Sequence, residues 1–196
     1  MTWVVVGLGN PDEEHVRTRH NAGRMAVELF ARSKGIEEWK DDRKARSFVA
    51  RGLVGKAATV FVLPNTYMNK SGAAVSTFVK SMAAAERLLV VYDELDLPLG
   101  TIKISFDRGS GGHKGVDSVL RAVKTKRFAR IRIGISPTTP SGAMRKPSGD
   151  TDVEKFILGE FKHDELATLK KIFKRVSEAI ECVIADGREV AMNTFN

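Results

Sequence analysis

GLGNPDEEHVRTRHNAG, residues 7–23, is the stretch that decides how this chain folds. It follows a short β-branched run at 2–7 that predicts a buried strand, and it precedes an amphipathic segment at 22–34 that predicts a helix. Open α/β sheets bind their ligands at the edge where such strands give way to loops. The polar side chains of this loop, His20 among them, are therefore the first candidates for a functional site.

The same alternation of strand and helix patterns continues to the end of the chain. It predicts a single α/β domain over 1–196, with three layers and a mixed, twisted sheet flanked by helices. Residues 136–152 contain three prolines and few apolar side chains, which predicts a mobile loop, and a periodic segment at 163–185 predicts a C-terminal helix. Further strands are expected at 47–53, 58–63, 88–92, 101–106 and 130–135, and helices at 71–84 and 116–123.

Composition favours an anionic partner. The formal net charge of +8 and a pI near 9.7 point to nucleic acid first. A single cysteine, Cys182, excludes an internal disulfide and any cysteine-rich zinc cluster, and fits a reducing compartment. Because no apolar run approaches the roughly 18 residues that cross a bilayer, and no signal peptide is evident, we expect a cytoplasmic protein that does not associate with membranes.

The two glycines at the start of the loop do not form a dinucleotide-binding fingerprint. In Gly-x-Gly-x-x-Gly the third glycine would fall at Asp12, and Pro11 prevents a helix from following directly. Gly7 and Gly9 more plausibly allow a sharp turn and a close approach to Asn10.

His20 and Asp93 are candidates for a general base and the group that orients it. A lone histidine at a helix start is usually a cap or a surface residue, but Asp93 follows the apolar strand at 88–92. If that strand neighbours the first one, carboxylate and imidazole meet at one sheet edge. No Gly-x-Ser-x-Gly elbow is present, so water is the expected nucleophile.

The acidic cluster Asp93, Glu94 and Asp96 is a weaker candidate for a metal site. Two carboxylates at i and i+3 after a strand are more often solvated or capping residues. We therefore do not expect a metal ion at this cluster.

Asn10, Asn69 and His113 follow separate apolar elements, and each alone would be an ordinary turn residue. Together they predict a cleft of neutral hydrogen-bonding groups suited to a peptide or ester carbonyl. Tyr67 and Met68 would give that cleft an apolar wall.

The glycine-rich run at 109–115 has backbone amides free to meet an anion, ahead of a helix N-terminus. Basic residues surround it, most of them ordinary solvated side chains, and this half of the chain favours contact with a phosphate backbone. They are Lys103, Arg108, Lys114, Arg121, Lys124, Lys126, Arg127, Arg130 and Arg132.

These motifs resemble the bacterial-type peptidyl-tRNA hydrolase family. The resemblance implies a monomeric, phosphorylase/hydrolase-like α/β domain that hydrolyses the ester between a peptide and the 3′ ribose of tRNA without metal or cofactor. The matching motifs are Gly-Leu-Gly-Asn-Pro at 7–11, Thr-Arg-His-Asn-Ala-Gly at 18–23, Thr-Tyr-Met-Asn at 66–69, Asp-Glu-Leu-Asp-Leu-Pro at 93–98, Gly-Gly-His at 111–113 and Arg-Ile-Gly-Ile at 132–135.

The resemblance also implies roles for single residues. His20 would activate water and Asp93 would orient it, while Asn10 would contact the peptide end and Asn69 would hold the substrate and the oxyanion. His113 would bind the peptide backbone. The side chains facing the tRNA acceptor stem and backbone would be Lys103, Arg108 and Arg132.

The chain departs from the family pattern at several positions. Lys114 stands where asparagine is usual, and its charge would instead stabilise the oxyanion or bind a terminal phosphate. His15 replaces a usual tyrosine, which affects stacking on the terminal adenosine, and Asp12 replaces a common glycine. Ser105 replaces a frequent basic residue.

Two other functions compete with hydrolysis of peptidyl-tRNA. Lys114 keeps open a non-catalytic RNA-binding or splicing relative of the same fold, although pure binding does not need His20 and Asp93. A small-molecule hydrolase that uses the same pair would be insensitive to salt, unlike a phosphate-dependent reaction.

Overall fold

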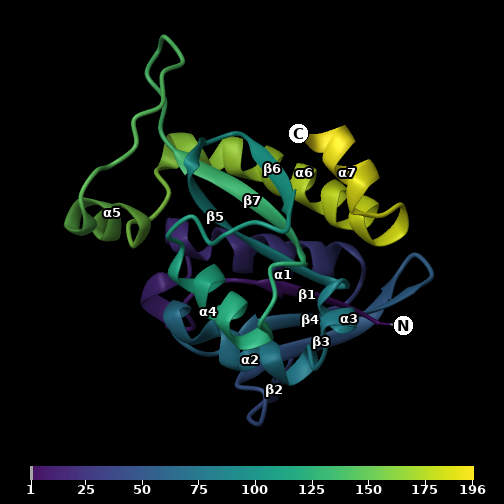
Figure 1. Cartoon of the computed structure of the whole chain (residues 1–196). Helices are drawn as coiled ribbons and strands as arrows, with labels where there is room; N and C mark the ends of the chain where they lie inside the picture. The colour runs from purple at the N-terminus through teal and green to yellow at the C-terminus, as the bar shows by residue number, and fades with distance from the viewer. Residues whose placement is uncertain (1) are drawn as a thin grey trace.

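A computed structural model describes residues 2–196, which contain a seven-stranded mixed sheet with the strand order β2-β3-β4-β1-β5-β7-β6 (Figure 1). The strands are β1 (Trp3–Gly7), β2 (Lys40–Asp42), β3 (Ser47–Val54), β4 (Ala57–Pro64), β5 (Leu88–Pro98), β6 (Ile102–Phe106) and β7 (Ala129–Ser136).

The centre of the sheet is parallel. β1 pairs with β4 on one side and with β5 on the other, so that Val5 lies opposite both Phe61 and Leu89. Parallel central strands are covered on both faces, which explains why these segments are apolar throughout. Gly7 pairs with Val91, so β1 and β5 reach the same sheet edge, as the sequence predicted.

Helices cover both faces of the sheet and complete the predicted three layers (Figure 1). α1, α6 and α7 contribute to one core, whereas α2 and α4 contribute to the other. The helical elements are η1 (Glu13–His15), η2 (Arg19–Asn21), α1 (Ala22–Ser33), η3 (Met68–Lys70), α2 (Ser71–Phe78), α3 (Met82–Ala85), α4 (Lys114–Val123), α5 (Asp150–Ile157), η4 (His163–Glu165), α6 (Leu166–Ala185) and α7 (Arg188–Phe195).

Close packing of α1 on β5 places the loop at 7–23. A Cβ atom on Gly23 would lie 2.1 Å from the carbonyl oxygen of Val91, so only glycine permits this approach. The first turn of α1, and η2 before it, are thereby held directly against the strand that carries Asp93.

The prediction of a single helix at 71–84 is wrong, because the segment forms two helices. α2 ends at Phe78, Val79 is extended, and the Ser81 hydroxyl accepts a hydrogen bond from the Ala84 amide to begin α3. Serine at this position competes with a continuous helix by capping a new one. Met82, the first residue of α3, is 63% exposed.

The polar side chains of β6 are not all exposed. Ser105 is buried, because Arg130 lies directly opposite it on β7 and covers the same face. Arg130 is itself 1% exposed, and its guanidinium donates hydrogen bonds to the carbonyl oxygens of Arg108 and Gly109. Arg130, one of the basic residues counted around the glycine-rich run, is thus a buried side chain that holds this loop.

Three short elements were not predicted. β2 has no apolar pattern, and α5 and α7 each follow a glycine with positive φ, Gly149 and Gly187. α5 begins inside the stretch expected to be a loop, so the segment between β7 and α5 spans 137–149. The mobility of that segment stays a prediction.

Between residues 2 and 196, no helix is long and apolar enough to cross a bilayer. Cys182 is only half-buried, beside Asp186, and burial together with this carboxylate raises the pKa of its thiol.

Candidate active site

His20, Asp93 and His113 meet at the carboxyl edge of the sheet. His20 lies on η2, Asp93 on β5, and His113 immediately before α4. The Nδ1 atom of His20 is 3.0 and 2.9 Å from the two carboxylate oxygens of Asp93, and the Nε2 atom of His113 is 3.0 Å from Oδ1. The sequence predicted the first pair but not the contact between His113 and Asp93.

The hydrogen bonds of His113 determine which of its nitrogens carries a proton. Its Nδ1 accepts hydrogen bonds from the backbone amides of Gly115 and Val116, so His113 is the N-cap of α4. A nitrogen that accepts two such bonds has no proton, so the proton lies on Nε2 and is donated to Asp93. The centroids of the His113 and His20 rings lie 5.0 Å apart, and the two rings are tilted by 49°.

Asp93 is ionised in this arrangement. Burial, with 2% of the residue exposed, favours the neutral acid, but the two imidazoles that face the carboxylate outweigh it and hold the pKa of Asp93 well below its usual range. An ionised carboxylate only accepts hydrogen bonds, so Nδ1 of His20 must donate. The lone pair of His20 is then on Nε2, which has no hydrogen-bond partner among residues 2–196 and is free to accept a proton.

Asn10 is held in place by Asn21, the neighbour of His20 in the sequence, to which the sequence analysis assigned no role. Asn21 accepts a hydrogen bond from the backbone amide of Asn10 at 2.8 Å and donates to its carbonyl at 2.9 Å. The Oδ1 atom of Asn10 accepts from the amide of Met68, which ties the loop after β1 to η3. The position of Asn21 next to His20 in the sequence was the available signal.

Other predicted residues lie outside this hydrogen-bonded group. Tyr67 is 57% exposed and Asn69 is exposed, on either side of the buried Met68. His15, on η1, lies 3.5 Å from the carboxylate of Asp12. In the described part of the chain, none of these side chains hydrogen-bonds to the imidazoles of His20 and His113.

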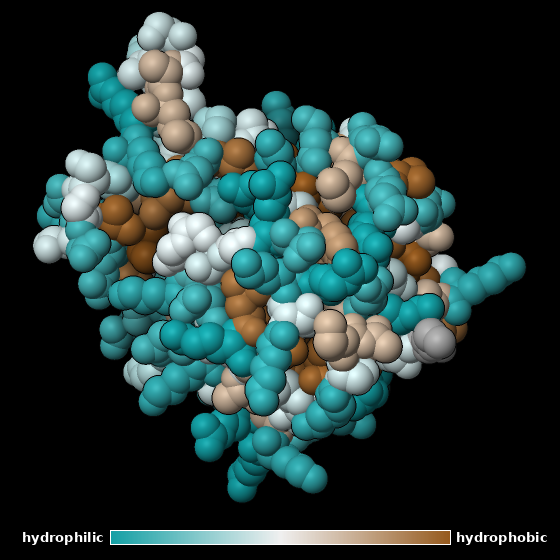
Figure 2. All heavy atoms as spheres, viewed as in Figure 1, coloured by the Kyte–Doolittle hydropathy of each residue, from teal (hydrophilic) through white to brown (hydrophobic). Residues whose placement is uncertain are grey.

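A cavity of about 510 Å³ opens directly from the histidine pair, and Lys114 lies on its wall. It lies between the end of β5, the glycine-rich loop and α5. Figure 2 shows apolar side chains gathered beside α5, on a face that is otherwise mostly hydrophilic. The lining residues are His20, Asp93, Glu94, Leu95, Asp96, Gly111, Gly112, His113, Lys114, Lys146, Asp150, Val153, Glu154 and Ile157.

A second, basic cavity of about 520 Å³ adjoins the first and shares Glu94 and Gly111 with it. The three residues expected to face RNA, Lys103, Arg108 and Arg132, all line it. Arg132 donates to the carboxylate of Glu94 at 2.9 Å, which links the basic cavity to the strand that carries Asp93. The structure thus brings the basic group next to the histidine pair.

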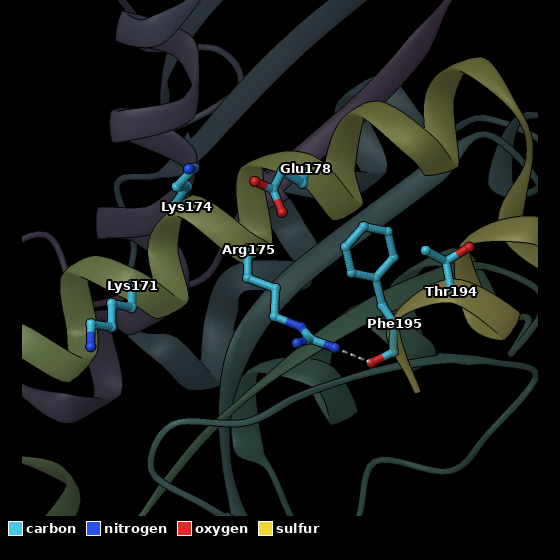
Figure 3. Close-up of a pocket in the computed structure, with 6 residues that line it drawn as sticks. All are labelled: Lys171, Lys174, Arg175, Glu178, Thr194 and Phe195. Carbon is cyan, nitrogen blue, oxygen red and sulfur yellow. Dashed lines mark hydrogen bonds between the residues drawn. The ribbon is translucent and has the colours of Figure 1, made fainter.

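A third hollow of about 300 Å³ lies between α6 and α7 (Figure 3). Arg175 spans it and donates to the backbone carbonyl of Phe195 at 3.3 Å. Lys171, Lys174 and Glu178 also line it, and no histidine does. It therefore offers no counterpart to the base on His20.

Two of the carboxylates in the weak metal candidate pair with cationic side chains instead: Glu94 pairs with Arg132, and Asp96 pairs with Lys146. Among the described residues, the side-chain atoms close enough to share an ion are instead those of His20, Asp93 and His113, all within 4.8 Å of one another. A metal ion there would have to displace the protons that both imidazoles donate to Asp93.

Comparisons with known proteins agree over nearly the full chain. The family model described as peptidyl-tRNA hydrolase matches residues 4–196. The peptidyl-tRNA hydrolase of Chloroflexus aggregans is 38% identical, covering 99% of this chain and 98% of the relative, and that of Syntrophotalea carbinolica is 36% identical, covering 98% and 96%. The crystal structure of peptidyl-tRNA hydrolase from Acinetobacter baumannii superposes with a TM-score of 0.87 at 32% identity, covering 100% of this chain and 94% of the other.

Proposed function

The chain belongs to the peptidyl-tRNA hydrolase family, and from this premise we propose that it hydrolyses the ester between a peptide and the 3′ ribose of tRNA. The observation that carries the proposal is the contact of His20 with both carboxylate oxygens of Asp93, at 3.0 and 2.9 Å, beside an open cavity. It supplies an oriented base where the ester must lie.

His20 activates water in this proposal. Its Nε2 removes a proton as the water oxygen attacks the ester carbonyl carbon, and the same proton then passes to the departing 3′ oxygen of the ribose. Asp93 keeps the ring in the tautomer that leaves Nε2 free, and stabilises the imidazolium that forms. An ester is an activated acyl group, so an oriented base and neutral donors suffice without a cofactor.

Neutral donors next to His20 bind the peptide and the developing oxyanion. The Oδ1 atom of Asn10 is already occupied by the amide of Met68, so its Nδ2 donor is the atom available to a substrate carbonyl. Asn69 is exposed beside Met68, and in this proposal its side-chain amide holds the substrate and the oxyanion. His15 and Tyr67 provide surfaces for the terminal adenosine and the peptide, and His113 contributes to the same peptide site.

The basic cavity holds the RNA. Lys103, Arg108 and Arg132 line it and contact phosphates of the acceptor stem, which places the terminal ribose at the cavity shared with His20. Lys114 adds a cation at the boundary between peptide and RNA. The enzyme acts as a monomer in the cytoplasm, where peptidyl-tRNA is found.

The non-catalytic alternative is not favoured, because the relatives are named hydrolases and the base with its orienting carboxylate is retained. The test is single-turnover cleavage of N-acetyl-aminoacyl-tRNA by wild type and by His20→Ala. We expect His20→Ala to be slower by about 10²–10⁴-fold. His163→Ala, at an exposed histidine outside both cavities, should cleave at the wild-type rate. Equal rates for wild type and His20→Ala would overturn the assignment of His20 as the base. Tight tRNA binding without cleavage by wild type would favour the non-catalytic RNA-binding alternative.

A further inference from the structure

The wall of the catalytic cavity opposite the histidines is one face of α5. Asp150, Val153, Glu154 and Ile157 line the cavity at spacings of three and four residues, which places them along one side of a helix. Leu95, from β5, lines the same cavity. This wall therefore combines apolar side chains with two carboxylates.

α5 is held firmly against the segment that carries His20. Arg19, 5% exposed, donates from its guanidinium to the carbonyl oxygen of Glu160 at 2.6 Å and to the carboxylate of Glu165 at 2.7 Å. The same guanidinium lies 4.5 Å from the ring centroid of Phe156, which is part of α5. The helix face and the catalytic imidazole are thus parts of one packed unit.

The carboxylates on this wall are not neutralised by the protein. Glu94 and Asp96, also in the cavity lining, pair with Arg132 and Lys146. Within residues 2–196, neither Asp150 nor Glu154 has a cationic partner within 4.0 Å, and Lys114 on the opposite wall is the one unpaired cation in the lining.

An unpartnered polar atom on a buried side chain also lines this cavity. His20 is 5% exposed and its Nε2 has no partner, although it is the atom that must meet the ester. Of the residues on the α5 side of the cavity, Leu95, Val153 and Ile157 are half-buried, whereas Asp150 and Glu154 are exposed.

We infer that this cavity is a subsite for a lysine or arginine side chain on the residue esterified to tRNA. The apolar stem of such a side chain packs on Leu95, Val153 and Ile157, and its cationic end reaches Asp150 and Glu154. The inference rests on the proposed hydrolysis and adds a preference for cationic C-terminal residues. Because both carboxylates are exposed, the preference is modest and weakens with salt.

The experiment compares two substrates on the same tRNA, Nα-acetyl-lysyl-tRNA and Nα,Nε-diacetyl-lysyl-tRNA, which differ in the charge at the end of the side chain. We expect wild type to prefer the charged substrate by about fivefold in kcat/KM at low salt. D150N/E154Q should lose the preference, and D150K/E154K should reverse it. D152N, which changes an acid on α5 outside the cavity lining, should keep it.

Equal kcat/KM for the two substrates in wild type would overturn the subsite, and so would a preference that survives in D150K/E154K. Failure of the proposed function is a different result, because wild type would then cleave neither substrate.

Discussion

Asp93 is the central residue of the proposed mechanism, because it accepts hydrogen bonds from two imidazoles at once. It accepts from His20 and His113, and the backbone amides at the start of α4 keep the proton of His113 on the nitrogen that faces it. The carboxylate thus has all its donors in place before substrate arrives, which is the preorganisation that an efficient base requires.

The low pKa of Asp93 predicts a specific acid sensitivity. A carboxyl whose pKa is lower in the folded than in the unfolded state contributes stability above its unfolded value of about 4, and that contribution is lost as the pH falls below it. Urea unfolding of wild type between pH 5 and 3, a range set by that unfolded value, should therefore show a steeper loss of unfolding free energy than unfolding of Asp93→Asn. Asp41→Asn, at an exposed acid on β2, should match the wild-type slope. Identical slopes for Asp93→Asn and wild type would contradict the assignment.

Lys114 lines the catalytic cavity, next to His113 in the sequence. Lys114→Asn should weaken tRNA binding modestly and reduce the slope of log K against log salt by about 1, as expected when a phosphate contact is lost. Lys44→Asn, at an exposed lysine after β2, is the matched control. An unchanged slope for Lys114→Asn would mean that Lys114 does not meet a phosphate.

At the scale of the elements, the side chain of Arg19 connects η2 to α5 and to η4. Its guanidinium is buried between Phe156 and Phe161, at 4.5 and 5.4 Å from their ring centroids, and pairs with Glu165. Arg19→Ala leaves that carboxylate without its partner and should cost about 3–5 kcal/mol in unfolding free energy, measured by urea denaturation. Arg17→Ala, two residues earlier and exposed, should stay within about 0.5 kcal/mol of wild type. If both variants unfold alike, Arg19 does not hold these elements together.

At the scale of the whole molecule, the sequence predicted the architecture better than the contacts within the site. Long apolar strands and periodic helices report burial directly, so the mixed three-layer sheet and the meeting of His20 with Asp93 followed from the pattern. The contact of His113 with Asp93, the support of Asn10 by Asn21 and the burial of Arg19 depend on residues from different elements, which a pattern within one segment does not report. The break after Phe78 depends on local capping by Ser81, and α5 follows Gly149 with no side-chain cap to announce it.

The central claim for the whole molecule is that Asp93 contributes to hydrolysis by orienting His20. A double-mutant cycle tests this claim most directly. The measurement is the single-turnover rate of N-acetyl-aminoacyl-tRNA cleavage at saturating enzyme for wild type, His20→Ala, Asp93→Asn and the double variant. Residues that act as one unit give non-additive losses, so we predict that the double variant is no slower than His20→Ala alone. A double variant slowed by the product of the two single losses would show that Asp93 acts independently of His20, and would contradict this mechanism.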